Sequence, residues 1–109
     1  MDHTYVDDVV VGTLAALDHP DHPFDVYNLA TGTAPSVHEM IAMLRDIVPG
    51  ARLSAGDGEI KHPGGIAMPR KGALDSSRAA KVFGFRPRYD LRTGLEAYVR
   101  DKRARSASW

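Results

Sequence analysis

The fold is decided by the stretch Asp25-Val26-Tyr27-Asn28-Leu29-Ala30-Thr31-Gly32-Thr33-Ala34-Pro35-Ser36-Val37-His38-Glu39-Met40. Residues 24–30 alternate in polarity and are rich in strand-forming side chains, so they predict a short strand. Residues 31–35 contain a glycine and a proline and predict a turn. Ser36 and Glu39 then fit a capping box, and the apolar stripe that follows predicts a helix ending at Pro49-Gly50. A strand, a turn and a helix in this order are typical of α/β proteins, which commonly place ligands at such turns.

The residues before this stretch predict a strand and a helix. Residues 4–6 favour a strand, and Asp7 or Asp8 can cap a helix that runs to Leu17. This helix has an apolar face that we expect to point inward, formed by Val10, Val11, Leu14 and Leu17. Two prolines between Asp18 and Pro23 stop the helix. The histidines and aspartates of this segment are zinc-ligand types, but each histidine precedes a proline and is pushed into extended backbone. We therefore predict a polar loop and no metal site.

The second half of the chain predicts a short strand, a long loop and two helices. Residues 51–54 favour a strand. Residues 54–72 are rich in glycine and proline, and we interpret them either as a solvated loop or as a substrate-facing lid, made cationic by Lys61, His62, Arg70 and Lys71. A short helix is expected from Ser76 to Phe83, capped by Asp75 and ended by Gly84. A last helix is expected from Leu91 to about Arg103. It is capped by Asp90, and its inward face is formed by Leu91, Leu95, Tyr98 and Val99.

These elements predict an α/β fold with α+β-like character, in which a small mixed or parallel sheet is accompanied by about four helices. We expect residues 1–105 to form one lobe and residues 106–109 to be a disordered tail. The chain has 109 residues, of which 43% are hydrophobic and 26% charged, as in ordinary globular proteins. It has no cysteine, no long apolar run and no secretory signal, so we expect a cytoplasmic protein without a membrane partner.

The net charge of zero hides an uneven distribution. Residues 1–50 hold eight acidic residues and one basic residue, a balance of 1 − 8 = −7, whereas residues 51–109 hold thirteen basic and six acidic residues, a balance of 13 − 6 = +7. We interpret the split as two halves of one lobe that attract each other rather than as a polyanion site. The basic end near Arg100 carries no aromatic or groove-reading motif, so we expect no nucleic-acid partner.

The sequence offers few motifs that are typical of catalytic sites. No Ser/His/Asp triad follows from local signals, and no Gly-x-Gly-x-x-Gly turn is present. We do not assign Tyr98 and Lys102 to a Tyr-x-x-x-Lys catalytic pair. The sequence therefore predicts no catalytic residue, no cofactor-binding residue and no metal ligand in this chain.

Five segments, in order, resemble the C-terminal part of one enzyme family. They cover nearly the whole chain to about residue 103. The segments are Thr4 to Val9, Val26 to Gly32 with Ser36 to Met40, Leu74 to Lys81, Phe83 to Pro87, and Leu91 to Leu95. Together they are similar to the substrate-binding lobe of an extended short-chain dehydrogenase/reductase of the NAD-dependent epimerase/dehydratase family.

The resemblance implies a two-lobed parent enzyme. Its N-terminal Rossmann lobe binds NAD or NADP and carries a Tyr-x-x-x-Lys pair, and its C-terminal lobe closes over the substrate, commonly a nucleotide-linked sugar. This chain resembles the closing lobe with partial Rossmann C-terminal elements. The resemblance implies that the chain lacks the cofactor turn and the Tyr-x-x-x-Lys pair and is inactive alone. It binds no cofactor itself, and its partner is the missing N-terminal lobe.

The resemblance also suggests substrate contacts. In many members an Arg-Asp pair holds nucleotide phosphate through its arginine; here Asp2 matches the acid and Met1 takes the arginine's place. His62-Pro63-Gly64 stands where an Arg-Pro-Gly segment usually lies, and Arg70 is the better phosphate candidate by charge. The substrate-binding residues that we predict are Tyr5, His62 and Arg70.

Two readings of the chain stay open. The first is a part of a longer epimerase, dehydratase or reductase, with a non-sugar carbonyl or hydroxyl substrate not excluded. The second is a free-standing small-ligand or oligomerisation module derived from that lobe. Under either reading we expect self-association, because a lobe without its partner exposes apolar surface.

Overall fold

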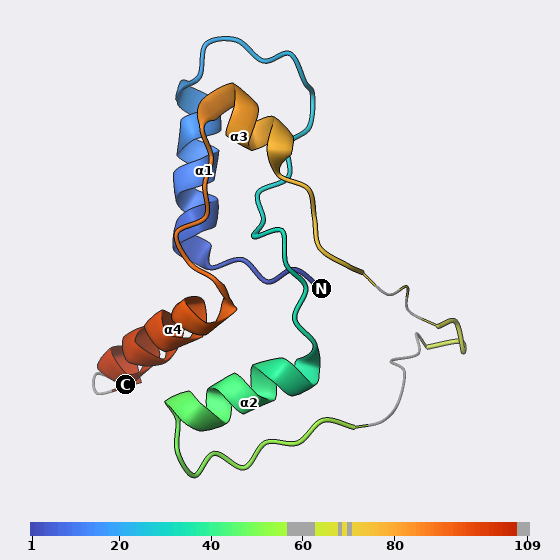
Figure 1. Ribbon diagram of the computed structural model, residues 1–109, viewed down its shortest axis with the longest axis vertical. Coiled ribbons are helices and arrows are strands. Elements are labelled where there is room, and N and C mark those ends of the chain that lie inside the picture. The colour runs from blue at the N-terminus through green and yellow to red at the C-terminus, as the bar shows by residue number, and fades with distance from the viewer. Residues whose placement is uncertain (57–62, 68, 70, 107–109) are drawn as a thin grey trace.

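A computed structural model describes residues 1–56, 63–67, 69 and 71–106 of the chain. Within these residues there are four helices, and they pack in two pairs (Figure 1). One pair joins α1 to α3, and the other joins α2 to α4. Their bounds are α1 Val6–Asp18, α2 Val37–Ile47, α3 Ser77–Phe83 and α4 Leu91–Ser106.

The start of α2 confirms the predicted capping box. The Glu39 backbone N–H donates to Ser36 Oγ at 3.1 Å, and the Ser36 backbone N–H donates to Glu39 Oε2 at 2.8 Å. Two amides that the first turn leaves without helical partners are thereby satisfied. The sequence alone was sufficient here because every participant lies within four consecutive residues.

Local signals also set the ends of α3 and the start of α4. Gly84 follows α3 with φ of 71°, the left-handed conformation that glycine adopts at least cost. Asp90 Oδ1 accepts the backbone N–H of Thr93 at 2.8 Å, and Thr93 Oγ1 accepts that of Asp90 at 3.0 Å. α4 ends at Ser106, three residues beyond the predicted end, and residues 107–109 lie outside the described residues.

The predicted sheet is wrong for the part of the chain that the structure describes. Residues 4–6, 24–30 and 51–54 form no strand there. A strand needs a neighbour to accept and donate its backbone hydrogen bonds. At the end of the 24–30 segment a side chain takes that place, because Ser76 Oγ accepts the Ala30 N–H at 2.9 Å and donates to the Ala30 carbonyl at 3.1 Å.

The described chain is open rather than compact. Its radius of gyration is 16.9 Å, whereas a compact domain of this length has about 13 Å. Its buried hydrophobic side chains are mostly alanines: Ala30, Ala79, Phe85, Leu91 and Ala97. Beside so small a core, hydrogen bonds between segments far apart in the sequence also hold the described chain together.

The inward apolar face predicted for α1 is wrong. Val10, Leu14 and Leu17 are 50%, 54% and 75% exposed, and Val11 is also exposed. The side of α1 that packs against the chain instead carries Asp8 and Gly12. Gly12 permits the approach: a Cβ there would lie 2.9 Å from Phe85 Cδ2. On α4, Leu91 is buried as predicted, but Tyr98 is 55% exposed, so its inward assignment is also wrong.

Candidate functional site

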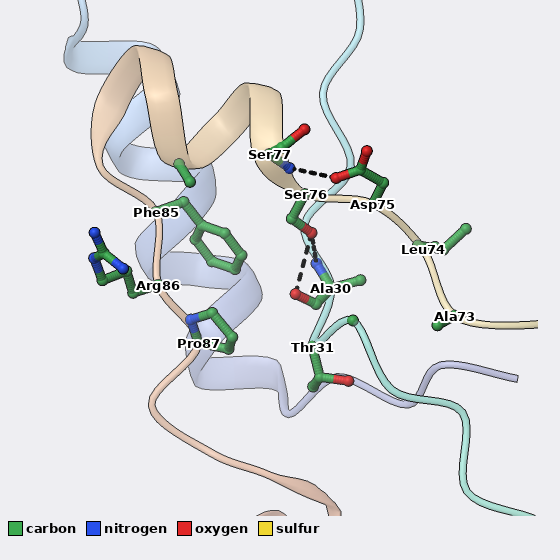
Figure 2. A pocket seen from close by; sticks show the side chains of 12 residues that line it. Ala30, Thr31, Ala73, Leu74, Asp75, Ser76, Ser77, Phe85, Arg86 and Pro87 are labelled. Atoms are coloured by element: carbon green, nitrogen blue, oxygen red, sulfur yellow. Dashed lines mark hydrogen bonds between the residues drawn. The ribbon is translucent and has the colours of Figure 1, made fainter.

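A hollow with a volume of about 750 Å³ lies where four segments of the described chain meet. Residues 30–32, 73–77 and 85–87 line it together with Ala80 of α3. In Figure 2 the ring of Phe85 lies between Pro87 and α3, whereas the Arg86 side chain points away from Ala30 and Ser76. The described wall combines small side chains and hydroxyls with larger apolar residues and with two charged residues, Asp75 and Arg86. It can shape a ligand site, but it supplies no acid–base pair, because its carboxylate, Asp75, is held by the Ser77 N–H.

Hydrogen bonds fix one rim of this hollow. Ser76 Oγ bridges the backbone N–H and carbonyl of Ala30 (Figure 2). Asn28 Nδ2 donates to the Asp75 carbonyl at 3.1 Å. Asp75 Oδ1 accepts the Ser77 N–H at 2.8 Å, so the predicted aspartate does satisfy an amide at the start of α3, although the residue next to the helix is Ser76. Hydrogen bonds from the Ser77 backbone and side chain lower the pKa of the Asp75 carboxyl.

Asp2 joins three segments that are far apart in the sequence. Its Oδ1 accepts the Thr31 N–H at 3.1 Å and the Thr31 hydroxyl at 2.5 Å. Its Oδ2 accepts the N–H of Gly32 at 2.8 Å and that of Leu74 at 3.2 Å. Partial desolvation, the largest single influence, raises the pKa of Asp2, but the hydrogen bonds from Thr31, Leu74 and Gly32 together hold it below its ordinary value.

Asp8 joins α1 to the segment that leads into α4. Only 3% of Asp8 is exposed, and its Oδ1 and Oδ2 accept the backbone N–H groups of Arg88 and Tyr89, each at 3.0 Å. The prediction that Asp7 or Asp8 caps α1 is therefore wrong, because Tyr5 precedes the helix and no side chain caps it. In Figure 1 the segment between α3 and α4 runs along α1.

Of the three predicted substrate-binding residues, Tyr5 can be placed. Its ring lies 4.6 Å from that of Tyr89 and against Gly94 of α4. It lines a second, smaller hollow of about 150 Å³ between residues 3–5 and α4. Desolvation, followed by the negative charges of Asp7 and Asp101, raises the pKa of the Tyr5 phenol. His62 and Arg70, with Lys61, lie outside the described residues, so the structure does not test whether they approach Tyr5.

Tyr98 and Lys102 do have the spacing of a Tyr-x-x-x-Lys pair. As a statement about spacing, the expectation from the resemblance that the chain lacks a Tyr-x-x-x-Lys pair is therefore wrong. Both residues lie on the exposed surface of α4, one turn apart. Because the sequence contains no Gly-x-Gly-x-x-Gly turn to hold a dinucleotide, we assign this pair no catalytic role.

The histidines after α1 belong to an aromatic cluster. His22 Nδ1 lies 2.9 Å from the Tyr27 hydroxyl, and His22 Nε2 lies 2.8 Å from the Ala16 carbonyl. Both ring nitrogens are thus occupied, and the ring also contacts Phe83 edge-on. Within the described part of the chain, no group of three or more histidine, cysteine or acidic side chains is placed to hold a metal ion.

The carboxylates of Asp2 and Asp8 hold distant segments together through hydrogen bonds, and the sequence did not predict this role for either residue. In the sequence, Asp2 stands out only as the acid of an Arg-Asp pair. Asp8 is chemically identical to its neighbour Asp7 in the sequence, and no local signal distinguishes the two.

Among the described residues, no helix is both long and apolar enough to cross a bilayer.

Comparisons with known proteins identify the relatives of this chain. No family model matches it. It is similar to UDP-glucuronate 4-epimerase 2 and UDP-glucuronate 4-epimerase 1 of Arabidopsis thaliana, with 31% and 30% identity over 111 residues. Each alignment covers 91% of this chain but 25% of the relative, so the chain spans about a quarter of the length of the curated relatives it matches.

A solved structure shows the same relationship in three dimensions. It is a point mutant of UDP-glucuronic acid 4-epimerase from Bacillus cereus, in complex with UDP-4-deoxy-4-fluoro-glucuronic acid and NAD. It superposes with a TM-score of 0.69 at 28% identity, over 93% of this chain and 32% of that one. This similarity supports an α/β fold for the parent protein, although the secondary-structure elements of the described residues here are helices. The chain is therefore homologous to the C-terminal part of UDP-glucuronate 4-epimerases, which belong to the NAD-dependent epimerase/dehydratase family of extended short-chain dehydrogenase/reductases.

Proposed function

We propose that this chain is the substrate-binding portion of an NAD(P)-dependent sugar-nucleotide epimerase/dehydratase-like oxidoreductase. The observation that carries the proposal is the similarity, over 93% of the chain, to an enzyme solved with a UDP-linked sugar and NAD. The open structure and small core also support a chain that works together with further protein. In this proposal the partner is the N-terminal Rossmann lobe, and the chain is inactive without it.

The proposed substrate is a nucleotide-linked sugar, with UDP-glucuronate the first compound to test because the relatives are named for it. Tyr5 would contact the substrate from the segment before α1. Arg70 would hold the diphosphate, since a guanidinium can donate two parallel hydrogen bonds to a phosphate. His62 would contribute from the same loop as Arg70.

We assign the cofactor to the partner lobe. The sequence offers no glycine-rich dinucleotide turn, and the lining of the 750 Å³ hollow holds no acid–base pair. The hydride and proton transfers then take place outside this chain. Its own residues orient the substrate and exclude water from it.

The test places the chain in a full-length context. The matched 111 residues of Arabidopsis UDP-glucuronate 4-epimerase 2 are replaced by this chain, and UDP-glucuronate is titrated into the chimera by calorimetry. We expect saturable binding that Arg70→Ala weakens about tenfold or more, as the loss of a charged hydrogen bond predicts. The matched control is Arg103→Ala, because Arg103 is exposed near the end of α4 and does not line the hollow. A folded chimera that fails to bind, or equal effects of both variants, would contradict the proposal.

The second candidate is a free-standing ligand or oligomerisation module, and the exposed apolar face of α1 is the observation that favours association. Sedimentation of the isolated chain tests self-association, which we expect at high concentration. A thermal-shift screen against nucleotide sugars tests the ligand-binding module. Saturable stabilisation of the isolated chain by one of them would favour the module over the enzyme portion.

A further inference from the structure

Two exposed segments of this chain carry opposite charge. Residues 18–25, which begin at the last residue of α1, hold Asp18, Asp21 and Asp25 and no lysine or arginine, a balance of 0 − 3 = −3. All three aspartates are exposed. Residues 100–106, the last turns of α4, hold three arginines, one lysine and one aspartate, a balance of 4 − 1 = +3, and each of these residues is exposed. We call them the acidic segment and the basic segment.

The two segments lie too far apart to attract each other within one copy. In Figure 1 the loop that follows α1 lies at one end of the long axis, whereas the end of α4 lies toward the other end. The longest extent of the molecule is 48 Å, and the screening length at physiological salt is about 8 Å. The ion pair between Arg92 and Asp46, at 3.1 Å, does join the two halves of the chain, but it lies in the first turn of α4, outside both segments.

We propose that the basic segment of one copy docks on the acidic segment of a second copy. The two segments have equal and opposite charge and both are exposed, so a second copy of this chain presents the complementary surface. The contact joins unlike surfaces, and each copy that uses its basic segment keeps its acidic segment free for the next. It therefore builds open chains of copies. This inference does not depend on the proposed function, because neither segment lines the hollow of about 750 Å³.

Association through the exposed apolar residues of α1 would behave differently. Two α1 helices packed together join like surfaces and form a closed dimer. Burial of apolar surface involves no charge that sodium chloride could screen. Salt dependence and growth beyond the dimer therefore distinguish the contact between the charged segments from an apolar contact.

The first test is sedimentation equilibrium of the 109-residue chain at about 0.05 M and about 0.5 M sodium chloride. We expect the higher salt to weaken association about tenfold or more. Arg100→Glu with Arg103→Glu changes the basic segment to 2 − 3 = −1 and should abolish association. The matched control is Arg52→Glu with Arg88→Glu, which changes the net charge equally at exposed arginines outside both segments and should retain association.

Disulfide formation then locates the contact, because the chain contains no cysteine. Ala104→Cys marks the basic segment and Pro20→Cys marks the acidic segment, both at exposed positions. In an equal mixture under mild oxidation, we expect disulfides between unlike variants to form about tenfold faster than those between like variants. A chain that stays monomeric would overturn the proposal, as would association that salt leaves unchanged. Equal loss of association in the control variant, or preferential pairing of like cysteines, would also overturn it.

Discussion

Replacing Asp8 with asparagine is expected to weaken the joint between α1 and the segment that leads into α4. The Asp8 carboxylate is 3% exposed and accepts two backbone N–H groups, from Arg88 and Tyr89, each at 3.0 Å. A hydrogen bond to a charged group contributes about 1.5–3 kcal/mol. An asparagine keeps one accepting oxygen, without the charge, and turns an N–H donor toward the other amide. We therefore expect a loss of about 2–4 kcal/mol of unfolding free energy.

Asp7 provides the matched control for this substitution. It is adjacent in the sequence and in the same first turn, but it is exposed. Asp7→Asn removes only a favourable interaction with the helix dipole, about 0.3–1 kcal/mol. The assay is urea unfolding followed by far-ultraviolet circular dichroism, with hydrogen exchange at the Arg88 and Tyr89 amides as a local readout. Equal unfolding midpoints for the two variants, or unchanged exchange at both amides in Asp8→Asn, would refute this reasoning.

Two further predictions concern pH and packing. Because hydrogen bonds hold the pKa of Asp2 below its ordinary value, the Asp2 carboxylate stabilises the fold above the unfolded pKa of about 3.9. This contribution is lost as the pH falls through the folded pKa. The free energy of unfolding of Asp2→Asn should therefore fall less steeply at acid pH than that of the unmodified chain, and an equally steep fall would contradict this. Gly12→Ala should destabilise by about 1–2 kcal/mol despite the higher helix propensity of alanine, because its Cβ would lie 2.9 Å from Phe85. In Gly94→Ala the nearest atom to the added Cβ is Tyr5 Cβ at 3.4 Å, so this variant should be neutral or stabilising by up to about 1 kcal/mol. The reverse order of unfolding midpoints would refute the packing account.

Local chemistry made the helices predictable. The bonds between Ser36 and Glu39 and between Asp90 and Thr93 span three residues each, and Gly84 needs only its own backbone freedom. Such signals require no knowledge of what lies across the molecule. The four helices accordingly lie close to their predicted positions.

The sheet and the inward face of α1 were not predictable in the same way. Residues 24–30 have the composition of a strand, but strand formation depends on a neighbour, and Ser76 Oγ alone pairs with the end of the segment. Val10 and Leu14 are apolar, but whether they are buried depends on what covers them. The composition of a segment shows that it favours strand pairing or burial. Whether it pairs or is buried depends on which other segments lie next to it.

The candidate site shows the same difference between features set by neighbouring residues and features set by contacts far apart in the sequence. The identity of Asp8 as a joint depends on where Arg88 and Tyr89 lie, eighty residues later in the chain. The family, in contrast, was predictable, because five ordered segments carry the resemblance that the comparisons with UDP-glucuronate 4-epimerases then confirmed. The predicted roles of Tyr5, His62 and Arg70 stay predictions.

The central claim is that this chain holds the substrate and leaves the cofactor to the rest of the protein. Calorimetric titration of NAD into the isolated 109-residue chain tests this claim most directly. The account predicts no saturable heat of binding, because the sequence contains no glycine-rich dinucleotide turn. Saturable binding of NAD to the isolated chain, with a dissociation constant in the micromolar range, would contradict it.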